Sequence, residues 1–123
     1  MVTPNLPLVV AIVEDDAATR TALGRLLRAA GFEPALFESA ETYLDASPAP
    51  LCVVVDVQLR GMSGLELLGR LRREGDSPPI IVMTGSNEAI IRERAQQNGC
   101  AGFFWKPIDG SVLIAAIASL ANL

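Results

Sequence analysis

Histidine is absent from the 123 residues of this chain. Its absence excludes Ser-His and Cys-His catalytic arrangements, histidine-based metal sites and a phosphohistidine relay within the chain. Any chemistry performed by these residues must therefore use carboxylates, hydroxyls and lysine.

Cysteine is scarce, and apolar runs long enough to span a membrane are missing. Cys52 and Cys100 lie far apart in apolar surroundings, and the N-terminal "MVTPNLP" does not resemble an export signal. We therefore expect buried free thiols in a reducing cytoplasm rather than a disulfide. Apolar runs such as "LVVAIV" fall far short of a transmembrane helix, so we expect no membrane association.

Positive charge is also limited, since the formal net charge is −4 and the isoelectric point is near 4.7. Phosphate-rich partners favour clustered Lys and Arg, so direct binding of nucleic acid by this chain is not expected. The 50% apolar composition is sufficient for a hydrophobic core. The length predicts a single domain over residues 1–123.

Short apolar segments alternate with helical patterns along the chain. β-Branched runs at 8–13, 51–55 and 79–83 predict strands buried on both faces, and residues 32–37 and 101–106 predict weaker strands. Helices are predicted after each strand, and their expected positions follow. The first begins after the acids 14–16, the second at Ser39 and the third at Ser63, which is expected to form a capping box with Glu66. The fourth is expected over Asn87–Asn98 and the fifth over about 110–121.

Five consecutive strand–helix units predict a parallel sheet covered by helices on both faces, because strand–helix–strand crossovers are right-handed. The expected fold is α/β, a flavodoxin-like, doubly wound (βα)₅ three-layer sandwich with strand order 2-1-3-4-5. Pro34 supports an edge position for the second strand, since proline cannot donate a ladder hydrogen bond. Ligands of such sheets bind at the carboxyl ends of the strands, between the first and third.

Polar residues stand at four of these strand ends. The first strand is followed by acids 14–16, the third ends at Asp56, the fourth at Thr84 and the fifth at Lys106. Each has an ordinary structural explanation: helix capping for the acids, a turn for Asp56 or Thr84, and a solvated charge for Lys106. Their coincidence at one predicted crevice favours a functional site.

The chemistry available to such a crevice is restricted. Carboxylates held a few ångströms apart require a cation or a shared proton, and oxygen ligands suit Mg²⁺. A carboxylate beside Mg²⁺ can attack phosphorus to give an aspartyl phosphate, and a lysine can stabilise the transferring group. A hydroxyl such as that of Thr84 can donate a further hydrogen bond. The residues therefore favour phosphoryl transfer to Asp56.

The segments "VEDD", "VVVDVQLRGMSGLELL", "VMTG" and "AGFFWKP", in this order, cover nearly the whole chain. Together they resemble the receiver domain of bacterial two-component response regulators. The resemblance implies that Asp56 is the phosphoacceptor, Thr84 a switch hydroxyl and Lys106 the lysine that contacts the phosphoryl group.

The resemblance also implies a site for Mg²⁺, with Mn²⁺ as a substitute. Its expected ligands are Asp15, Asp56 and the backbone carbonyl of Gln58, with Glu14 acting through water. In the receiver pattern four residues separate the two site acids from an arginine. Counting back from Arg20 excludes the third acid, residue 16, which becomes the expected helix cap.

Two further expectations concern the fifth strand. The resemblance implies an aromatic rotamer switch at Phe103, although a core aromatic on an edge strand explains this residue equally well. Phe103 has no hydroxyl, so such a switch works by packing alone. The resemblance also implies a cis peptide bond between Lys106 and Pro107, which proline base rates alone do not predict.

The function implied is a phosphorylation-controlled switch rather than an enzyme, although the domain assists its own phosphorylation and dephosphorylation. The donor would be a sensor histidine kinase or a phosphotransfer protein. Movement of the surface built by residues 87–98, 101–106 and 110–121 would pass the signal to a downstream output protein or a second copy. Weak amphipathicity at 87–98 favours such movement. The chain could be a stand-alone receiver or a receiver cut from a longer regulator.

The sequence departs from the receiver pattern at Arg60, where proline is common. Gln58 and Ser86, which occupy positions that tune dephosphorylation in the family, leave the phosphorylated lifetime unassigned. Two other functions stay open. A flavin-phosphate module is disfavoured because "EDDAA" would repel phosphate. A magnesium-dependent phosphatase would use a second acid where Gln58 stands.

Overall fold

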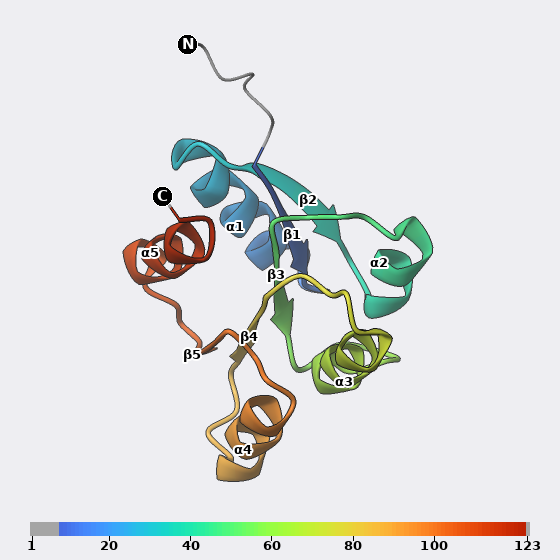
Figure 1. Cartoon of the computed structure of the whole chain (residues 1–123). Coiled ribbons are helices and arrows are strands. Elements are labelled where there is room, and N and C mark those ends of the chain that lie inside the picture. Colours follow the sequence, from blue (N-terminus) through green and yellow to red (C-terminus); the bar gives the residue numbers. More distant parts are fainter. Residues whose placement is uncertain (1–7, 123) are drawn as a thin grey trace.

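The computed structural model describes residues 8–122, which form five strands alternating with five helices (Figure 1). In chain order these are β1 (Val9–Val13), α1 (Ala17–Ala29), β2 (Glu33–Phe37), α2 (Ala40–Ala46), β3 (Cys52–Asp56), α3 (Gly64–Glu74), β4 (Ile80–Thr84), α4 (Ala89–Gln97), β5 (Gly102–Trp105) and α5 (Gly110–Leu120).

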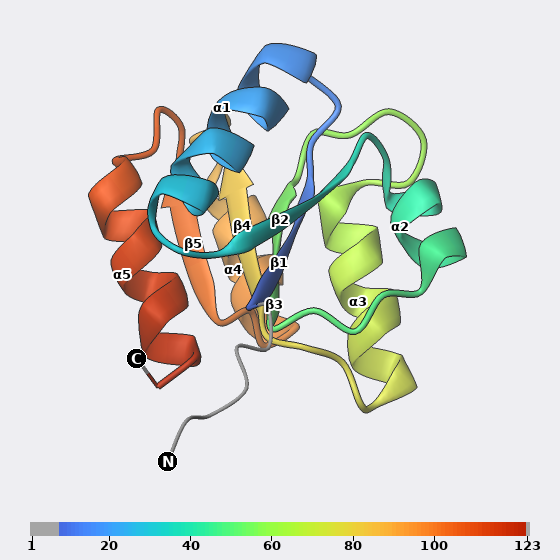
Figure 2. The ribbon, with the colours of Figure 1, turned by 90° about the horizontal axis from the view of Figure 1, so that it is seen from above.

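The strands form one parallel sheet in the order β2-β1-β3-β4-β5, which confirms the predicted topology. Pro34 lies on the edge strand β2, as expected from its missing N–H group. Figure 2 shows α1 and α5 on one side of the sheet and α2 and α3 on the other. The predicted three-layer, flavodoxin-like arrangement is confirmed.

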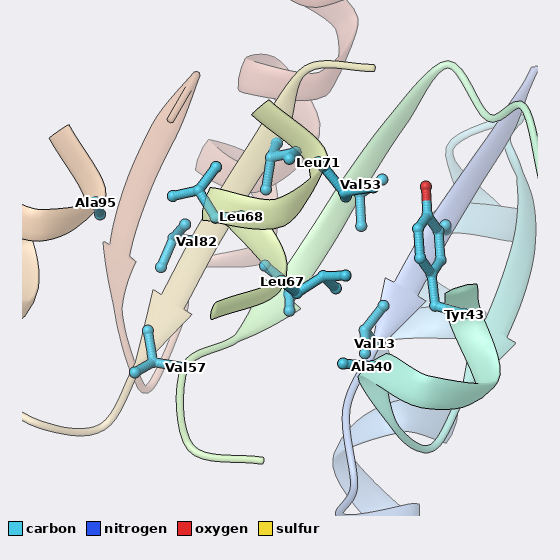
Figure 3. Packing of buried hydrophobic residues seen from close by; sticks show 13 residues of the cluster. Val13, Ala40, Tyr43, Val53, Val57, Leu67, Leu68, Leu71, Val82 and Ala95 are labelled. Carbon is cyan, nitrogen blue, oxygen red and sulfur yellow. The ribbon is translucent and has the colours of Figure 1, made fainter. Parts of the chain in front are cut away.

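The central strands are buried on both faces because their apolar side chains alternate between two cores. One core joins the sheet to α2, α3 and α4, and its residues include Val53, Leu67 and Leu68 (Figure 3). The other joins the sheet to α1 and α5, and includes Val54 and Ile117. Both cores bury β3, which fixes the position of the carboxylate at its end.

The predicted start of α3 at Ser63 is confirmed, but its predicted capping box and the predicted start of α4 need correction. Ser63 caps α3 by accepting a hydrogen bond from the Glu66 N–H at 3.1 Å. The Glu66 side chain is exposed, and in the described part of the chain it accepts no hydrogen bond from the Ser63 N–H, so the capping box is incomplete. The reciprocal capping box is instead at α2, between Ser39 and Thr42. The helix predicted from residue 87 starts at Ala89, and its N-cap Glu88 makes no side-chain capping hydrogen bond.

The expectations of free thiols and of a cis proline bond agree with the structure. Cys52 and Cys100 are free thiols, the first fully buried and the second partly buried. The Lys106–Pro107 peptide bond is cis, as the resemblance implied. Within residues 8–122 no helix combines the length and apolar character that crossing a bilayer requires.

Candidate functional site

The sheet topology brings the polar strand ends together. β1 and β3 are neighbours, and their pairing continues through Val13 and Val55 to the acids that follow. β3 pairs with β4 so that Asp56 lies opposite Met83, and β4 pairs with β5 so that Thr84 lies opposite Trp105. Because parallel strands end at the same edge, the residues predicted from separate motifs lie at one edge of the sheet.

Three carboxylates form a cluster at this edge of the sheet. Glu14, Asp15 and Asp56 each place a carboxylate oxygen within 4.8 Å of the other two. Glu14 is completely buried and Asp56 is 3% exposed, whereas Asp15 is partly exposed. Three acids this close repel one another, and burial of two of them increases the cost.

Lys106 partly compensates this charge. Its Nζ donates to Glu14 Oε1 at 2.7 Å and to Asp56 Oδ2 at 2.9 Å. Burial opposes the charged amine, but the bonds to Glu14 and Asp56 outweigh it and raise the pKa of Lys106. Burial also raises the pKa of Glu14; the hydrogen bond from Lys106 opposes that rise and the Asp56 carboxylate adds to it.

The third acid of the opening motif has a separate role. Asp16 is the N-cap of α1, and its Oδ2 accepts hydrogen bonds from the Thr19 N–H at 2.9 Å and the Thr19 hydroxyl at 2.6 Å. The predicted cap is therefore confirmed. Arg20, used in the sequence only for counting, donates from Nη1 to the Glu14 carbonyl at 2.8 Å and so braces the end of β1.

The loop after β3 supplies backbone donors to the acids. The Gln58 N–H donates to Asp56 Oδ1 at 3.1 Å, while the Gln58 side chain is exposed. The Arg60 N–H donates to Asp15 Oδ2 at 3.3 Å. A fourth acid, Glu41 of α2, contacts the same loop at Met62, and the sequence carried no signal for this contact because helix α2 lies outside every motif.

Two predicted switch residues lie beside the cluster rather than in it. Thr84 is completely buried, and its Oγ1 accepts a hydrogen bond from the Ser86 N–H at 3.0 Å, which is the turn role weighed for it. Phe103 is partly buried against the α3-side core and makes an edge-to-face contact with Trp105, with ring centroids 5.0 Å apart.

The donor set fits a hard divalent cation. All three clustered groups offer carboxylate oxygens, and one positive charge from Lys106 leaves the group of four with an excess of negative charge. Mg²⁺ prefers such oxygen ligands and is bound by one or two carboxylates with water. A phosphoryl group would find a carboxylate nucleophile and an ammonium group at the same place.

Comparison with known proteins agrees with this chemistry. A family model described as the response regulator receiver domain matches residues 10–118. The chain is 39% identical over 110 residues to the transcriptional regulatory protein FixJ of Bradyrhizobium diazoefficiens, covering 88% of this chain and 54% of that protein. It is 40% identical over 119 residues to FixJ of Azorhizobium caulinodans, covering 94% of this chain and 56% of that protein.

The chain thus spans about half the length of these curated relatives. Among solved structures, a crystal structure of FixJ-N superposes with a TM-score of 0.85 and 31% identity, over 95% of both chains. The response regulator StyR superposes with a TM-score of 0.84 and 34% identity, over 93% of this chain and 59% of that one. The chain belongs to the response regulator receiver domain family.

Proposed function

We propose that residues 1–123 act as one receiver unit that accepts a phosphoryl group on Asp56 and uses it as a signal. The observation that carries this proposal is the position of Lys106 Nζ, 2.9 Å from Asp56 Oδ2 and 2.7 Å from Glu14 Oε1. A lysine held there is ready to stabilise a phosphoryl group arriving at Asp56.

The proposed donor is a phosphohistidine of a sensor histidine kinase or phosphotransfer protein, as for the response regulator family to which the chain belongs. The chain has no histidine of its own that could carry the phosphoryl group. An Asp56 carboxylate oxygen forms the new O–P bond as the donor's P–N bond breaks. The bonding electron pair leaves with the imidazole nitrogen. The negatively charged phosphoryl oxygens then lie near the Lys106 ammonium group, which favours the transfer.

Asp15 and Asp56 would hold the cation, with the Gln58 carbonyl as a third ligand and with Glu14 acting through water. Mg²⁺, or Mn²⁺ in its place, would neutralise carboxylate repulsion and charge on the transferred group. Lys106 holds Glu14 and Asp56 in place, and the Gln58 and Arg60 N–H groups orient the Asp56 and Asp15 carboxylates.

The output surface is formed by α4, β5 and α5. Ile90, Trp105 and Val112 are large apolar side chains, one from each element, and each is more than 40% exposed. Ala95 is the one buried residue of α4, so few buried contacts anchor this helix. We propose that closure of Thr84 on the phosphoryl group, with rearrangement of Phe103, changes this surface for an output protein or a second copy.

The relatives named as transcriptional regulators are longer than this chain, which spans about half of each, so a DNA-directed output is proposed for a longer protein and not for these residues. The net charge of −4 agrees with that division. We propose that the function is exercised in the cytoplasm, where the proposed phosphohistidine donors act. The receiver unit itself is a phosphoacceptor that assists its own phosphorylation and dephosphorylation, without a separate substrate to turn over.

Incubation with MgCl₂ and acetyl phosphate tests the proposal. Intact-mass spectrometry is expected to show the gain of one phosphoryl group, which EDTA prevents. Lys106→Ala is expected to label more slowly, because no ammonium group stabilises the transfer. Unchanged labelling in Asp56→Asn would contradict the assignment.

A further inference from the structure

The loop of residues 57–63 forms one side of the acidic site. Its backbone N–H groups at Gln58 and Arg60 donate to Asp56 Oδ1 at 3.1 Å and to Asp15 Oδ2 at 3.3 Å. The loop therefore contacts two of the three clustered carboxylates through main-chain atoms. Any shift of the loop changes the orientation of both acids and of the Gln58 carbonyl.

The far end of the loop is held by Glu41, which lies in the first turn of α2. Glu41 Oε2 accepts a hydrogen bond from the Met62 N–H at 3.0 Å, across 21 positions of sequence. A carboxylate is a stronger acceptor than a neutral group. The Met62 N–H is the main cause of the lowered pKa of Glu41, so this side chain is ionised at neutral pH.

Gly61 provides the space for this contact. Its φ of +75° lies in the left-handed region, where glycine is favoured, and a Cβ built on it would lie 2.5 Å from Glu41 Oε2. The loop conformation and the Glu41 carboxylate are therefore matched to each other. A side chain at residue 61 would displace the carboxylate from the loop.

We infer that Glu41 is a positioning residue for the phosphoacceptor site, acting through the 57–63 loop on Asp56 and Asp15. The inference rests on the proposed function, because the geometry that Glu41 maintains is the geometry proposed to bind Mg²⁺ and accept a phosphoryl group. Glu41 itself does not touch the reacting atoms.

A purely local role for Glu41 makes a different prediction. An acid in the first turn of a helix interacts favourably with the helix dipole, and its loss would weaken α2 alone. Positioning requires instead that loss of Glu41 changes the acidic site. Glu41→Gln separates the two roles, since it removes the charge but keeps a side-chain oxygen that can accept from Met62 N–H.

The test compares Glu41→Ala and Glu41→Gln with Asp45→Ala, which removes another exposed acid from the same helix. Mg²⁺ affinity is measured by calorimetry, initial phosphorylation by acetyl phosphate, and exchange of the Met62 amide by NMR. We expect Glu41→Ala to weaken Mg²⁺ binding about tenfold, the lower end of what losing a group that orients a metal ligand costs. Its Met62 amide should exchange faster and its phosphorylation should slow, while Glu41→Gln recovers most of both.

Gly61→Ala disturbs the same contact from the loop side and serves as a second variant. It should also weaken Mg²⁺ binding, and combining it with Glu41→Ala should add little, as for two changes to one interaction. If Glu41→Ala and Gly61→Ala bind Mg²⁺ as tightly as Asp45→Ala, the inference is wrong, although phosphorylation of wild-type Asp56 still stands. A wild-type chain that takes up no phosphoryl group would instead overturn the proposed function.

Discussion

Gly64 begins α3 directly against the backbone carbonyl group of Asp56. A Cβ built on Gly64 would lie 2.8 Å from the Asp56 carbonyl carbon and 2.9 Å from Val57 Cα, both closer than real Cβ contacts. The Gly64 N–H also donates to the Val57 carbonyl at 3.0 Å. The start of α3 is thus packed against the end of the strand that carries the proposed phosphoacceptor.

Gly64→Ala is therefore expected to destabilise the chain by about 3 kcal/mol, the upper end for inserting one group into a packed site. The atoms nearest to this Cβ would all be backbone atoms, which cannot rotate away. Gly69→Ala, in the same helix, is the control, because its Cβ would meet no atom closer than 3.5 Å. It should be neutral or stabilising by about 0.5–1 kcal/mol. Urea unfolding measures both; equal effects would contradict the close packing at Gly64.

Asp15→Asn is expected to stabilise the chain when no divalent cation is present. Removing one of three carboxylates within 4.8 Å of one another relieves repulsion of about 1 kcal/mol per pair in a water-like environment. The same change should weaken Mg²⁺ binding. Urea unfolding in EDTA and again in excess MgCl₂ measures both effects, because a bound ion stabilises only the chain that binds it.

We expect Asp15→Asn to have the larger unfolding free energy in EDTA. In excess MgCl₂ the wild type should have the larger unfolding free energy, because the variant gains less from the bound ion. Asp16→Asn is the matched control, since that acid caps α1 and is not a member of the cluster. A larger loss of Mg²⁺ stabilisation in Asp16→Asn than in Asp15→Asn would show that the acids had been assigned to the wrong roles.

Cys52 should make the folded chain less stable as the pH rises. Burial raises the pKa of this thiol from 9.0 to about 11. Between these values the thiol stays protonated in the folded chain and ionises in the unfolded chain. Its contribution to stability is therefore complete below pH 9 and is lost as the pH rises through 11, a total of about 2–3 kcal/mol.

Cys52→Ala isolates this contribution, because the other groups that titrate in the same range are common to both chains. Between pH 8.5 and 11 the unfolding free energy of the wild type should fall by about 2–3 kcal/mol relative to that of Cys52→Ala. A constant difference over that range would mean that Cys52 is not protected from ionisation by the fold.

Much of this molecule follows from its sequence pattern, for identifiable reasons. The β-branched runs predicted to be strands 1, 3 and 4 are strands because both faces are buried, and the sheet order follows from short right-handed crossovers. The strand-end residues Asp56 and Lys106 meet because parallel strands end at one edge. The positions of the strands and of these strand-end residues can therefore be predicted from composition and spacing.

Contacts that depend on tertiary placement were not predictable. The Glu41–Met62 bond joins a helix and a loop 21 residues apart, and no local pattern specifies it. The capping box at Ser39 was missed because its partner is Thr42 rather than the usual Glu or Gln. Periodicity alone also treats acids 14–16 alike; their separation required the receiver resemblance and then the cap geometry of Asp16.

Trp105 offers a direct signal for the proposed switch. It is 44% exposed, stacks edge-to-face on Phe103, and has Arg92 5.3 Å from its ring centroid. Phosphorylation should change the Trp105 emission if Phe103 rearranges. Phe103→Leu should abolish most of that change while leaving labelling of Asp56 intact.

Phe104→Leu is the control for the fluorescence experiment, since Phe104 packs with the opposite core, on the α1 and α5 side. It should retain the wild-type emission change. If Phe103→Leu and Phe104→Leu respond to phosphorylation alike, Phe103 is a core aromatic and not a switch.

The most direct test of the central claim is to locate the phosphoryl group chemically. The chain is labelled with acetyl phosphate and MgCl₂ and then treated with borohydride, which reduces an aspartyl phosphate to homoserine. Peptide mass spectrometry should find homoserine at position 56 and unchanged aspartate at positions 15 and 16. Homoserine at another position, or label that resists borohydride, would contradict Asp56 as the phosphoacceptor.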